Sequence, residues 1–407
     1  MKAVLFDVTI PRYAAARLAG RLWADAYTGP VGPARLREVP VPELPGPDWV
    51  LVRTRLGGIC GSDLHTLFLE TSPSTSPLAS FPFVLGHENV GVIERAGPSV
   101  EGFSPGQRVV VDPVLGCEAR GIDPPCAACR RGDYQLCEHF TEGRLAPGTL
   151  IGTCRDTGGS WGEYFVAHRS QLLPVPEGLS DEAALMAEPF AVALHPVLRW
   201  PPAPGQTALV IGAGTVGLGV VAALKTVAPG VRVVAVARHR HQAEMAARLG
   251  ADEVVTERGR ALDERLASLL GARLLRPILG RPVPVGGADV TYECVGSGAS
   301  IADALRFTRA GGRVVLAGLA SLPRGVDWTP IWLKELELRG TYCYGYERLP
   351  DGRRMRTMAY ALELMAAGRV DLAPLVTHTF PLERWRDAVR VASRKGPSGA
   401  IRVALAP

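Results

Sequence analysis

The chain has 407 residues, of which 47% are hydrophobic and 21% are charged. At about 100–200 residues per domain, this length predicts two domains with cores of their own, and the composition excludes a disordered or collagen-like chain. The net charge of +5 comes without a basic block, so we expect no nucleic acid as partner. The first residues show no signal-peptide pattern, and we expect a cytoplasmic protein with no membrane partner.

Residues 1–184 predict an irregular β domain. They are rich in glycine and proline and contain short β-branched runs that turns separate. The strand candidates are Val50–Thr54, Gly91–Glu94 and Arg108–Val111. Residues 11–29 form an extra segment of unknown purpose, in which we expect an amphipathic helix over Arg12–Tyr27.

From residue 185 onward, apolar strand runs alternate with helical stretches, a pattern that indicates a parallel sheet covered on both faces. The strand candidates are Ala208–Ile211, Arg232–Val236, Glu253–Val255, Asp289–Tyr292, Arg313–Ala317 and Leu336–Thr341. Residues 257–285 lengthen the stretch between the third and fourth of these beyond what the fold needs. The end of the chain, with a helical run over Arg354–Gly368 and a strand over Ala400–Leu405, is expected to return to the first domain.

A glycine-rich turn follows the first strand of this second domain. The segment ALVIGAGTVG runs through the pattern G-x-G-x-x-G, formed by Gly212, Gly214 and Gly217, into a helical stretch. In this context such a turn holds a dinucleotide diphosphate at the helix N-terminus. We predict the dinucleotide site here and count Thr215 and Val216 as part of it.

The position after the next strand distinguishes NAD from NADP. A carboxylate about 20 residues beyond the glycines binds the ribose of NAD and repels the 2′-phosphate of NADP. Here that position is Ala237, and Arg238 and Arg240 follow. Arginine binds phosphate well, so the sequence favours NADP over NAD. Alternatively, both arginines are solvated residues at the start of a surface helix, and NAD binds without a carboxylate.

Zinc-ligand residue types occur in two short motifs of the first domain. GICGSDLH contains Cys60, and GHE contains His87 and Glu88. Thiolate, imidazole and carboxylate all bind zinc, and three protein ligands leave a position open for chemistry. Each residue alone has an ordinary structural explanation. Together, ahead of a dinucleotide domain, they indicate a catalytic zinc.

These motifs resemble those of the zinc-containing medium-chain dehydrogenase/reductase family, which includes alcohol, sorbitol, threonine and glucose dehydrogenases. GICGSDLH, GHE, GQRVVVDP, the cysteine cluster, EPFAVALH, VIGAGTVG and DVTYECVG follow the family's order and span nearly the whole chain. The resemblance implies an α/β protein. Its GroES-like β-rich catalytic domain covers residues 1–184 and 346–407, and its Rossmann domain, with a doubly wound parallel sheet, covers residues 185–345. It also implies a homodimer or homotetramer.

The resemblance assigns ligands to the catalytic zinc. It implies that Cys60 and His87 bind directly and that Glu88 is a neighbouring acid able to enter the coordination shell. Glu188 is the implied remaining ligand, direct or through water, where alcohol dehydrogenases have cysteine. This departure favours substrates of the polyol, sugar or threonine branch over simple primary alcohols.

The same motif implies a proton relay. Asp63 resembles the acid that orients the zinc histidine, Ser62 the hydroxyl that takes the alcohol proton, and His65 the residue that passes it to solvent. We therefore expect a zinc-dependent oxidoreductase that transfers a hydride between NAD(P) and a secondary alcohol or ketone, of a polyol, sugar or amino-alcohol. The alternatives are an NADPH-dependent aldehyde or ketone reductase and a non-catalytic dinucleotide-binding sensor or structural relative.

Four of the eight cysteines crowd into residues 112–140. Cys126, Cys129 and Cys137 resemble the lobe that holds a structural zinc in many family members, whose first cysteine stands three residues before the second. That position is Asp123 here, and Cys117 lies six residues further upstream. Zinc prefers all-thiolate structural sites, which favours Cys117 as the fourth ligand. The alternatives are an oxygen ligand from Asp123 and a lobe without metal.

Overall fold

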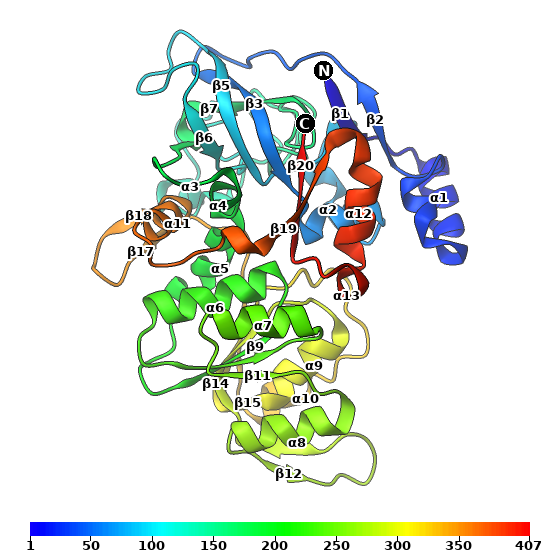
Figure 1. The fold of residues 1–407 in the computed structure, drawn as a ribbon, viewed down its shortest axis with the longest axis vertical. Coiled ribbons are helices and arrows are strands. Elements are labelled where there is room, and N and C mark those ends of the chain that lie inside the picture. Colours follow the sequence, from blue (N-terminus) through cyan, green and yellow to red (C-terminus); the bar gives the residue numbers. More distant parts are fainter. The chain divides into compact units, whose positions relative to one another are not determined.

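The computed structural model describes residues 1–407, leaving aside the side chain of Ala24. The chain divides into two compact units: unit 1 contains Met1–Glu188 and Met358–Pro407, and unit 2 contains Pro189–Thr357. The sequence puts the corresponding borders after residues 184 and 345. Figure 1 shows that both chain ends belong to unit 1.

Unit 1 is built on a sheet with the order β19-β20-β3-β5-β6-β8, in which β7 also pairs with β3, and on a smaller sheet, β2-β1-β4. The final strand pairs antiparallel with β3 and parallel with β19, so the end of the chain completes a sheet begun near its start. The strands are β1 (Lys2–Phe6), β2 (Ala34–Glu38), β3 (Trp49–Gly58), β4 (Phe83–Val84), β5 (Asn89–Ala96), β6 (Arg108–Val111), β7 (Tyr164–His168), β8 (Leu172–Pro174), β19 (Val376–Pro381) and β20 (Arg402–Ala406).

Two apolar clusters fill unit 1. One contains Trp49 and Phe165, and the other contains Trp161 and Trp385, and all four side chains are fully buried. The helices are α1 (Ile10–Leu22), α2 (Gly61–Leu67), α3 (Ala127–Arg130), α4 (Asp181–Leu185), α11 (Thr357–Ala366), α12 (Trp385–Ser393) and α13 (Lys395–Ser398), with 3₁₀ turns at Ala24–Thr28, Pro73–Leu78, Tyr134–Leu136, Arg169–Gln171, Ala373–Leu375 and Leu382–Arg384.

Unit 2 contains a parallel sheet with the order β11-β10-β9-β14-β15-β16. Counted along the chain this is 3-2-1-4-5-6, the doubly wound order that binds dinucleotides at the carboxyl ends of its strands. The strands are β9 (Thr207–Ile211), β10 (Arg232–Val236), β11 (Glu253–Val255), β14 (Ala288–Glu293), β15 (Thr308–Leu316) and β16 (Glu337–Gly340), and two hairpins join β12 (Arg273–Leu275) to β13 (Val283–Val285) and β17 (Tyr346–Arg348) to β18 (Arg354–Arg356).

The helices of unit 2 follow its strands in alternation, as the sequence predicts. They are α6 (Thr215–Val227), α7 (Arg240–Arg248), α8 (Gly259–Leu269), α9 (Gly298–Phe307) and α10 (Thr329–Leu333), and α5 (Ala187–Arg199) precedes the first strand. None of the helices in the described part of the chain combines the length and apolar character that a membrane crossing needs.

The predicted helix over Arg12–Tyr27 is wrong in its second half. The helix ends at Leu22, and the chain then turns back through Ala24–Thr28. The ring of Tyr27 lies so close to Gly20 that a Cβ there would stand 2.2 Å from it. Tyr27 also contacts Phe68 edge to face, with ring centroids 5.6 Å apart. This packing, which a local pattern cannot reveal, stops the helix.

The predicted helix over Arg354–Gly368 begins too early. Arg354–Arg356 form strand β18 in a hairpin with β17, and the helix starts only at Thr357. The turn contains Gly352 with a φ of +86°, a left-handed conformation that glycine adopts without strain. The sequence Pro-Asp-Gly before the strand is a turn signal and could have identified the hairpin.

Candidate functional site

A group of potential metal ligands lies inside unit 1. One ligand atom each from Cys60, His87 and Glu88 lies within 4.8 Å of the others. His87 and Glu88 are 7% and 1% exposed. Two motifs separated by a loop in the sequence are therefore adjacent in the fold.

The first turn of α2 holds Cys60 and Asp63 in a fixed relation. Cys60 is the residue that caps α2, its backbone N–H donates to Asp63 at 2.8 Å, and its sulfur accepts from the Asp63 amide. Asp63 is buried and its Oδ1 lies 3.5 Å from His87 Nδ1. Burial opposes charge on His87, but the neighbouring Asp63 and Cys60 outweigh it and raise the imidazole pKa well above its usual value. The groups around His87 therefore favour a positive charge at this position.

Glu88 is held by a cation on the last strand. Arg402 Nη1 lies 2.9 Å from Glu88 Oε1 and donates to the Ile59 carbonyl at 2.6 Å. Glu88 Oε2 has no hydrogen-bond partner among the described residues. A Cβ on Gly58 would stand 2.0 Å from this oxygen, so only glycine leaves room for the carboxylate there.

Glu188 lies near this group but is not among the residues within 4.8 Å of one another. It is the second residue of α5 and 3% exposed. Its pKa is raised to about 8, mainly by burial; the charge of His87 lowers it and that of Glu88 raises it. Two buried carboxylates that repel each other are stabilised by a cation between or beside them.

This donor set fits zinc. It offers one thiolate, one imidazole and carboxylate oxygens, and one of those oxygens is buried without a partner. The orientation of His87 by Asp63 is the arrangement that metal-binding imidazoles require.

The two residues of the expected proton relay lie on α2. Ser62 is half-buried on the first turn, and His65 follows three residues later, so both lie on one side of the helix. The side chain of His65 is 32% exposed and its Nδ1 lies 3.4 Å from Glu70 Oε2. The pair thus runs from a half-buried hydroxyl to an imidazole in contact with solvent.

A second group contains the sulfurs of Cys117, Cys126, Cys129 and Cys137, all within 4.8 Å of one another. Cys117 Sγ lies 3.5 Å from Cys137 Sγ, and none of the cysteines in the described chain forms a disulfide. Four sulfurs around zinc at about 2.3 Å stand about 3.8 Å apart in a tetrahedron, so this set fits a structural zinc. Asp123, the alternative to Cys117, is exposed and outside the group.

Backbone amides point at these sulfurs. The N–H groups of Cys126, Cys129 and His139 donate to the sulfurs of Cys117, Cys126 and Cys137 at 3.3–3.4 Å. Burial raises the pKa of Cys117 to about 11, whereas the Cys129 thiol and the His139 amide lower that of Cys137 to about 5. Without a metal, deprotonation of one thiol thus makes deprotonation of its neighbours harder. A bound cation would stabilise all four thiolates.

The glycine pattern of unit 2 forms the turn between β9 and α6. Gly212 has a φ of +99°, and a Cβ on Gly217 would stand 1.8 Å from the Gly212 carbonyl oxygen. Gly214 caps α6 and has no side chain that could bond the first amides of the helix, on Thr215 and Val216. These amides are suited to a diphosphate.

Two arginines meet beyond the adjacent strands. Because β10 and β11 are parallel neighbours with Val236 opposite Val255, the segments after them lie side by side. Arg258 donates from Nη2 to the backbone oxygen of Arg238 at 3.2 Å. Arg240, in contrast, donates to Glu244 at 2.7 Å and its side chain is 92% exposed. Ala237 is buried and leaves no acid at this position.

Sequence reasoning missed Arg258 and Arg402. Arg258 comes three residues after a strand predicted to lie beside the Arg238 strand, so the sheet order could have identified it. Arg402 had no local signal, because its place beside Glu88 depends on the pairing of β20 with β3.

Known proteins match the chain in both units. Residues 46–177 match the model of the alcohol dehydrogenase GroES-like domain, and residues 215–359 match that of the zinc-binding dehydrogenase. L-idonate 5-dehydrogenase of Vitis vinifera is 31% identical over 88% of this chain and 88% of its own length. L-threonine 3-dehydrogenase of Rhizobium johnstonii is 31% identical over 90% and 93%, respectively. A zinc-binding dehydrogenase of Sinorhizobium meliloti, solved with NADP bound, is similar with a TM-score of 0.72 and 26% identity, over 92% and 96%.

These matches confirm the expected fold class, a GroES-like domain with a Rossmann domain, and the expected class of enzyme, an oxidoreductase that uses zinc and NAD(P). They favour an enzyme over the alternative of a non-catalytic dinucleotide-binding sensor or structural relative. The chain belongs to the zinc-containing medium-chain dehydrogenase/reductase family.

Proposed function

We propose that this enzyme oxidises a secondary alcohol of a polyol, sugar or amino-alcohol to its ketone, or catalyses the reverse, with NADP as its preferred dinucleotide. The observation that carries the proposal is the buried group of Cys60, His87 and Glu88 with Glu188 nearby. L-idonate 5-dehydrogenase and L-threonine 3-dehydrogenase, two relatives, are named for substrates that carry a secondary hydroxyl.

In this proposal Cys60 and His87 bind the catalytic zinc, Glu188 supplies the remaining ligand directly or through water, and Glu88 lies beside the metal. When bound, zinc supplies Lewis-acid stabilisation of the negative charge that forms on the substrate oxygen. Asp63 keeps His87 in the orientation seen here, and Arg402 holds Glu88 by one oxygen. Arg402 therefore balances part of the negative charge that Glu88 and Glu188 bring to the metal site.

The reaction releases a hydride and a proton from the alcohol. The dinucleotide, when bound, would supply the acceptor of the hydride, and Ser62 and His65 would carry the hydroxyl proton to solvent. The position of the two residues on one side of α2, and the 32% exposure of His65, support this route.

A substrate panel tests the proposal. Rates of dinucleotide reduction are measured with a polyol, a sugar, an amino-alcohol with a secondary hydroxyl, and a primary alcohol as control. We expect kcat/KM for one of the first three classes to exceed that for the primary alcohol by about tenfold or more, because a polar site rejects analogues that lack its hydrogen-bonding groups. The highest value for the primary alcohol would contradict the proposal.

The preference for NADP rests on Arg238 and Arg258, with Arg240 as an outer contributor. A 2′-phosphate beside Arg238 would lie near the guanidinium of Arg258, which donates to the Arg238 backbone, and would find no carboxylate in the position of Ala237. We expect kcat/KM to be higher with NADP than with NAD and the order to reverse in Ala237→Asp. Arg258→Gln should weaken NADP binding about tenfold and leave NAD binding unchanged. Arg248→Gln, at the far end of α7, is the control.

Two further properties belong to the proposal. A homodimer or homotetramer is supported by the edge strand β16, whose residues are exposed, and by Trp332 and Leu333 just before it, which are 71% and 61% exposed. A cytoplasmic location is supported by the unbridged thiols of the cysteine lobe. Light scattering of the purified protein measures the first, and a monomer would contradict it.

A further inference from the structure

The proposed oxidoreductase chemistry leaves unused a group of arginines near the start of the chain. In the antiparallel pair of β1 and β2, Arg35 lies opposite Leu5 and Arg37 opposite Ala3. Residues two apart on a strand lie on the same face, so the two arginines stand next to each other. Arg12, in the first turn of α1, joins them.

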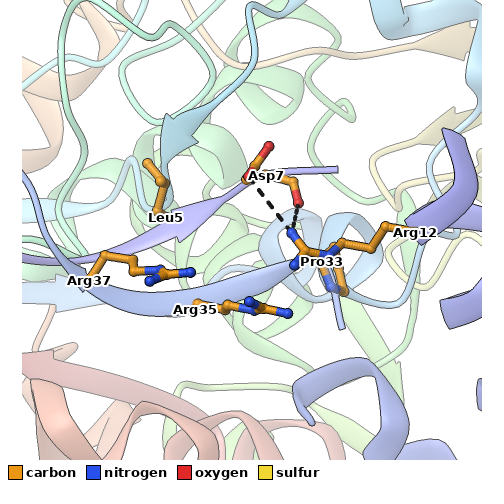
Figure 2. Close-up of a pocket in the computed structure, with 6 residues that line it drawn as sticks. All are labelled: Leu5, Asp7, Arg12, Pro33, Arg35 and Arg37. Atoms are coloured by element: carbon orange, nitrogen blue, oxygen red, sulfur yellow. Dashed lines mark hydrogen bonds and ion pairs between the residues drawn. The ribbon is translucent and has the colours of Figure 1, made fainter. Parts of the chain in front are cut away.

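These residues line one hollow, which we call the arginine hollow and which Figure 2 shows in close-up. It has a volume of about 200 Å³, part of which is open solvent. Its lining consists of Leu5, Asp7, Arg12, Pro33, Arg35 and Arg37. Asp7 is its one acid; its side chain is 52% exposed and lies 3.7 Å from Arg12. The lining therefore carries a net positive charge.

The positive charges of the hollow are balanced only in part, because Asp7 is the single acid among three arginines. Among the described residues, Arg35 and Arg37 have no carboxylate within ion-pair distance. Burial lowers the pKa of Arg35, and the charges of Arg12 and Arg37 lower it further; the charge of Asp7 opposes this shift, and Arg386 of α12 adds to the repulsion. Like charges at this spacing repel each other, and an anion between them would turn the repulsion into attraction.

Backbone carbonyls hold two of the three guanidinium groups that line the hollow, and one holds the nearby Arg386 as well. Arg35 donates to the Pro30 oxygen at 2.6 Å, and Arg12 donates to the Asp7 backbone oxygen at 3.0 Å. Arg386 is held by the Thr28 oxygen at 2.7 Å. A guanidinium has five N–H groups, so each retains donors for a ligand while its position is held.

We propose that the arginine hollow binds a phosphate group, either as inorganic phosphate or as a phosphate monoester. A planar guanidinium group binds two oxygens of a phosphate at once. Three guanidinium groups around one opening therefore suit a phosphate dianion better than they suit a ligand with a single carboxylate. The extra segment 11–29 would then have a role, because its helix α1 supplies Arg12.

The test is a titration of the zinc-loaded enzyme, with its dinucleotide site saturated, with inorganic phosphate by calorimetry. We expect binding in the unaltered chain and a loss of affinity of about tenfold or more in Arg35→Gln/Arg37→Gln. Arg37→Gln alone should lose part of the affinity; because Arg37 is exposed, this variant keeps the fold. The control is Arg21→Gln, which changes an exposed arginine in the last turn of α1. This variant should bind phosphate as the unaltered chain does.

Other anions complete the experiment. Glycerol 3-phosphate binding more tightly than inorganic phosphate would identify a monoester as the ligand, and the reverse order would identify free phosphate; either supports the site. Equal phosphate affinity in the unaltered chain and in Arg35→Gln/Arg37→Gln overturns the proposal. So does a heat signal from chloride at matched ionic strength as large as that from phosphate, because such binding would be unspecific screening.

Discussion

Replacing Cys117 tests the composition of the cysteine lobe in detail. In the structure its sulfur lies 3.5 Å from Cys137 Sγ and accepts the amide of Cys126 at 3.3 Å. Zinc binding by structural sites amounts to about 10–16 kcal/mol, so one of four thiolates corresponds to about 3 kcal/mol, or roughly 100-fold in zinc affinity. The buried amide of Cys126 also loses its acceptor, which costs about 1–3 kcal/mol.

We therefore expect Cys117→Ala to release one zinc per subunit to a competing chelator at least 100-fold more readily than the unaltered chain, and to unfold at a lower temperature. The assay is zinc release measured with a chromogenic chelator, alongside thermal unfolding. Asp123→Ala, a change at an exposed residue of the same loop, is the matched control and should behave like the unaltered chain. If Asp123→Ala loses the zinc and Cys117→Ala keeps it, the assignment of the fourth ligand is wrong.

Four further changes have defined outcomes. Asp63→Asn should lower catalytic zinc affinity or kcat about 10–100-fold, measured by zinc content and initial rates, because His87 loses the carboxylate that orients it; unchanged values would exclude that role. Ser62→Ala should lower kcat about 100-fold or more with a small change in KM, and an unaltered kcat would exclude the relay. Glu188→Ala should abolish turnover or retention of one zinc, and normal rates would remove it from the site. Gly217→Ala should weaken dinucleotide binding about tenfold or more, measured by fluorescence titration, because its Cβ would stand 1.8 Å from the Gly212 oxygen; full affinity would show that α6 adjusts without cost.

The strands of unit 2 could be predicted from the sequence because parallel strands buried on both faces are continuous apolar runs. β10 and β11 begin and end where the sequence puts them, and β9 differs by one residue. The predictions that were wrong concern segments whose structure depends on packing or pairing with other parts of the chain. Tyr27 stops α1 by packing on Gly20 and Phe68, and Arg354 belongs to a strand because β17 pairs with it.

In the candidate site, too, some residues could be predicted from a local sequence pattern and others depend on the fold. The motifs around Cys60 and His87 each have a local pattern, and the fold brings them within 4.8 Å. The cation beside Glu88 comes from the other end of the chain, so no local pattern could have predicted Arg402. Spacing alone left Cys117 and Asp123 both possible as the fourth ligand; in the fold Cys117 lies in the sulfur group and Asp123 does not, which supports the preference for Cys117.

The dependence of the reaction on zinc is best measured through the metal content and activity of one preparation. We predict two zinc ions per subunit. Treatment with a chelator should remove the ion held by Cys60 and His87, abolish oxidation of secondary alcohols with NADP, and allow activity to return when zinc is added back. Full alcohol oxidation by an enzyme that has lost all of its zinc would show that the reaction does not depend on the metal.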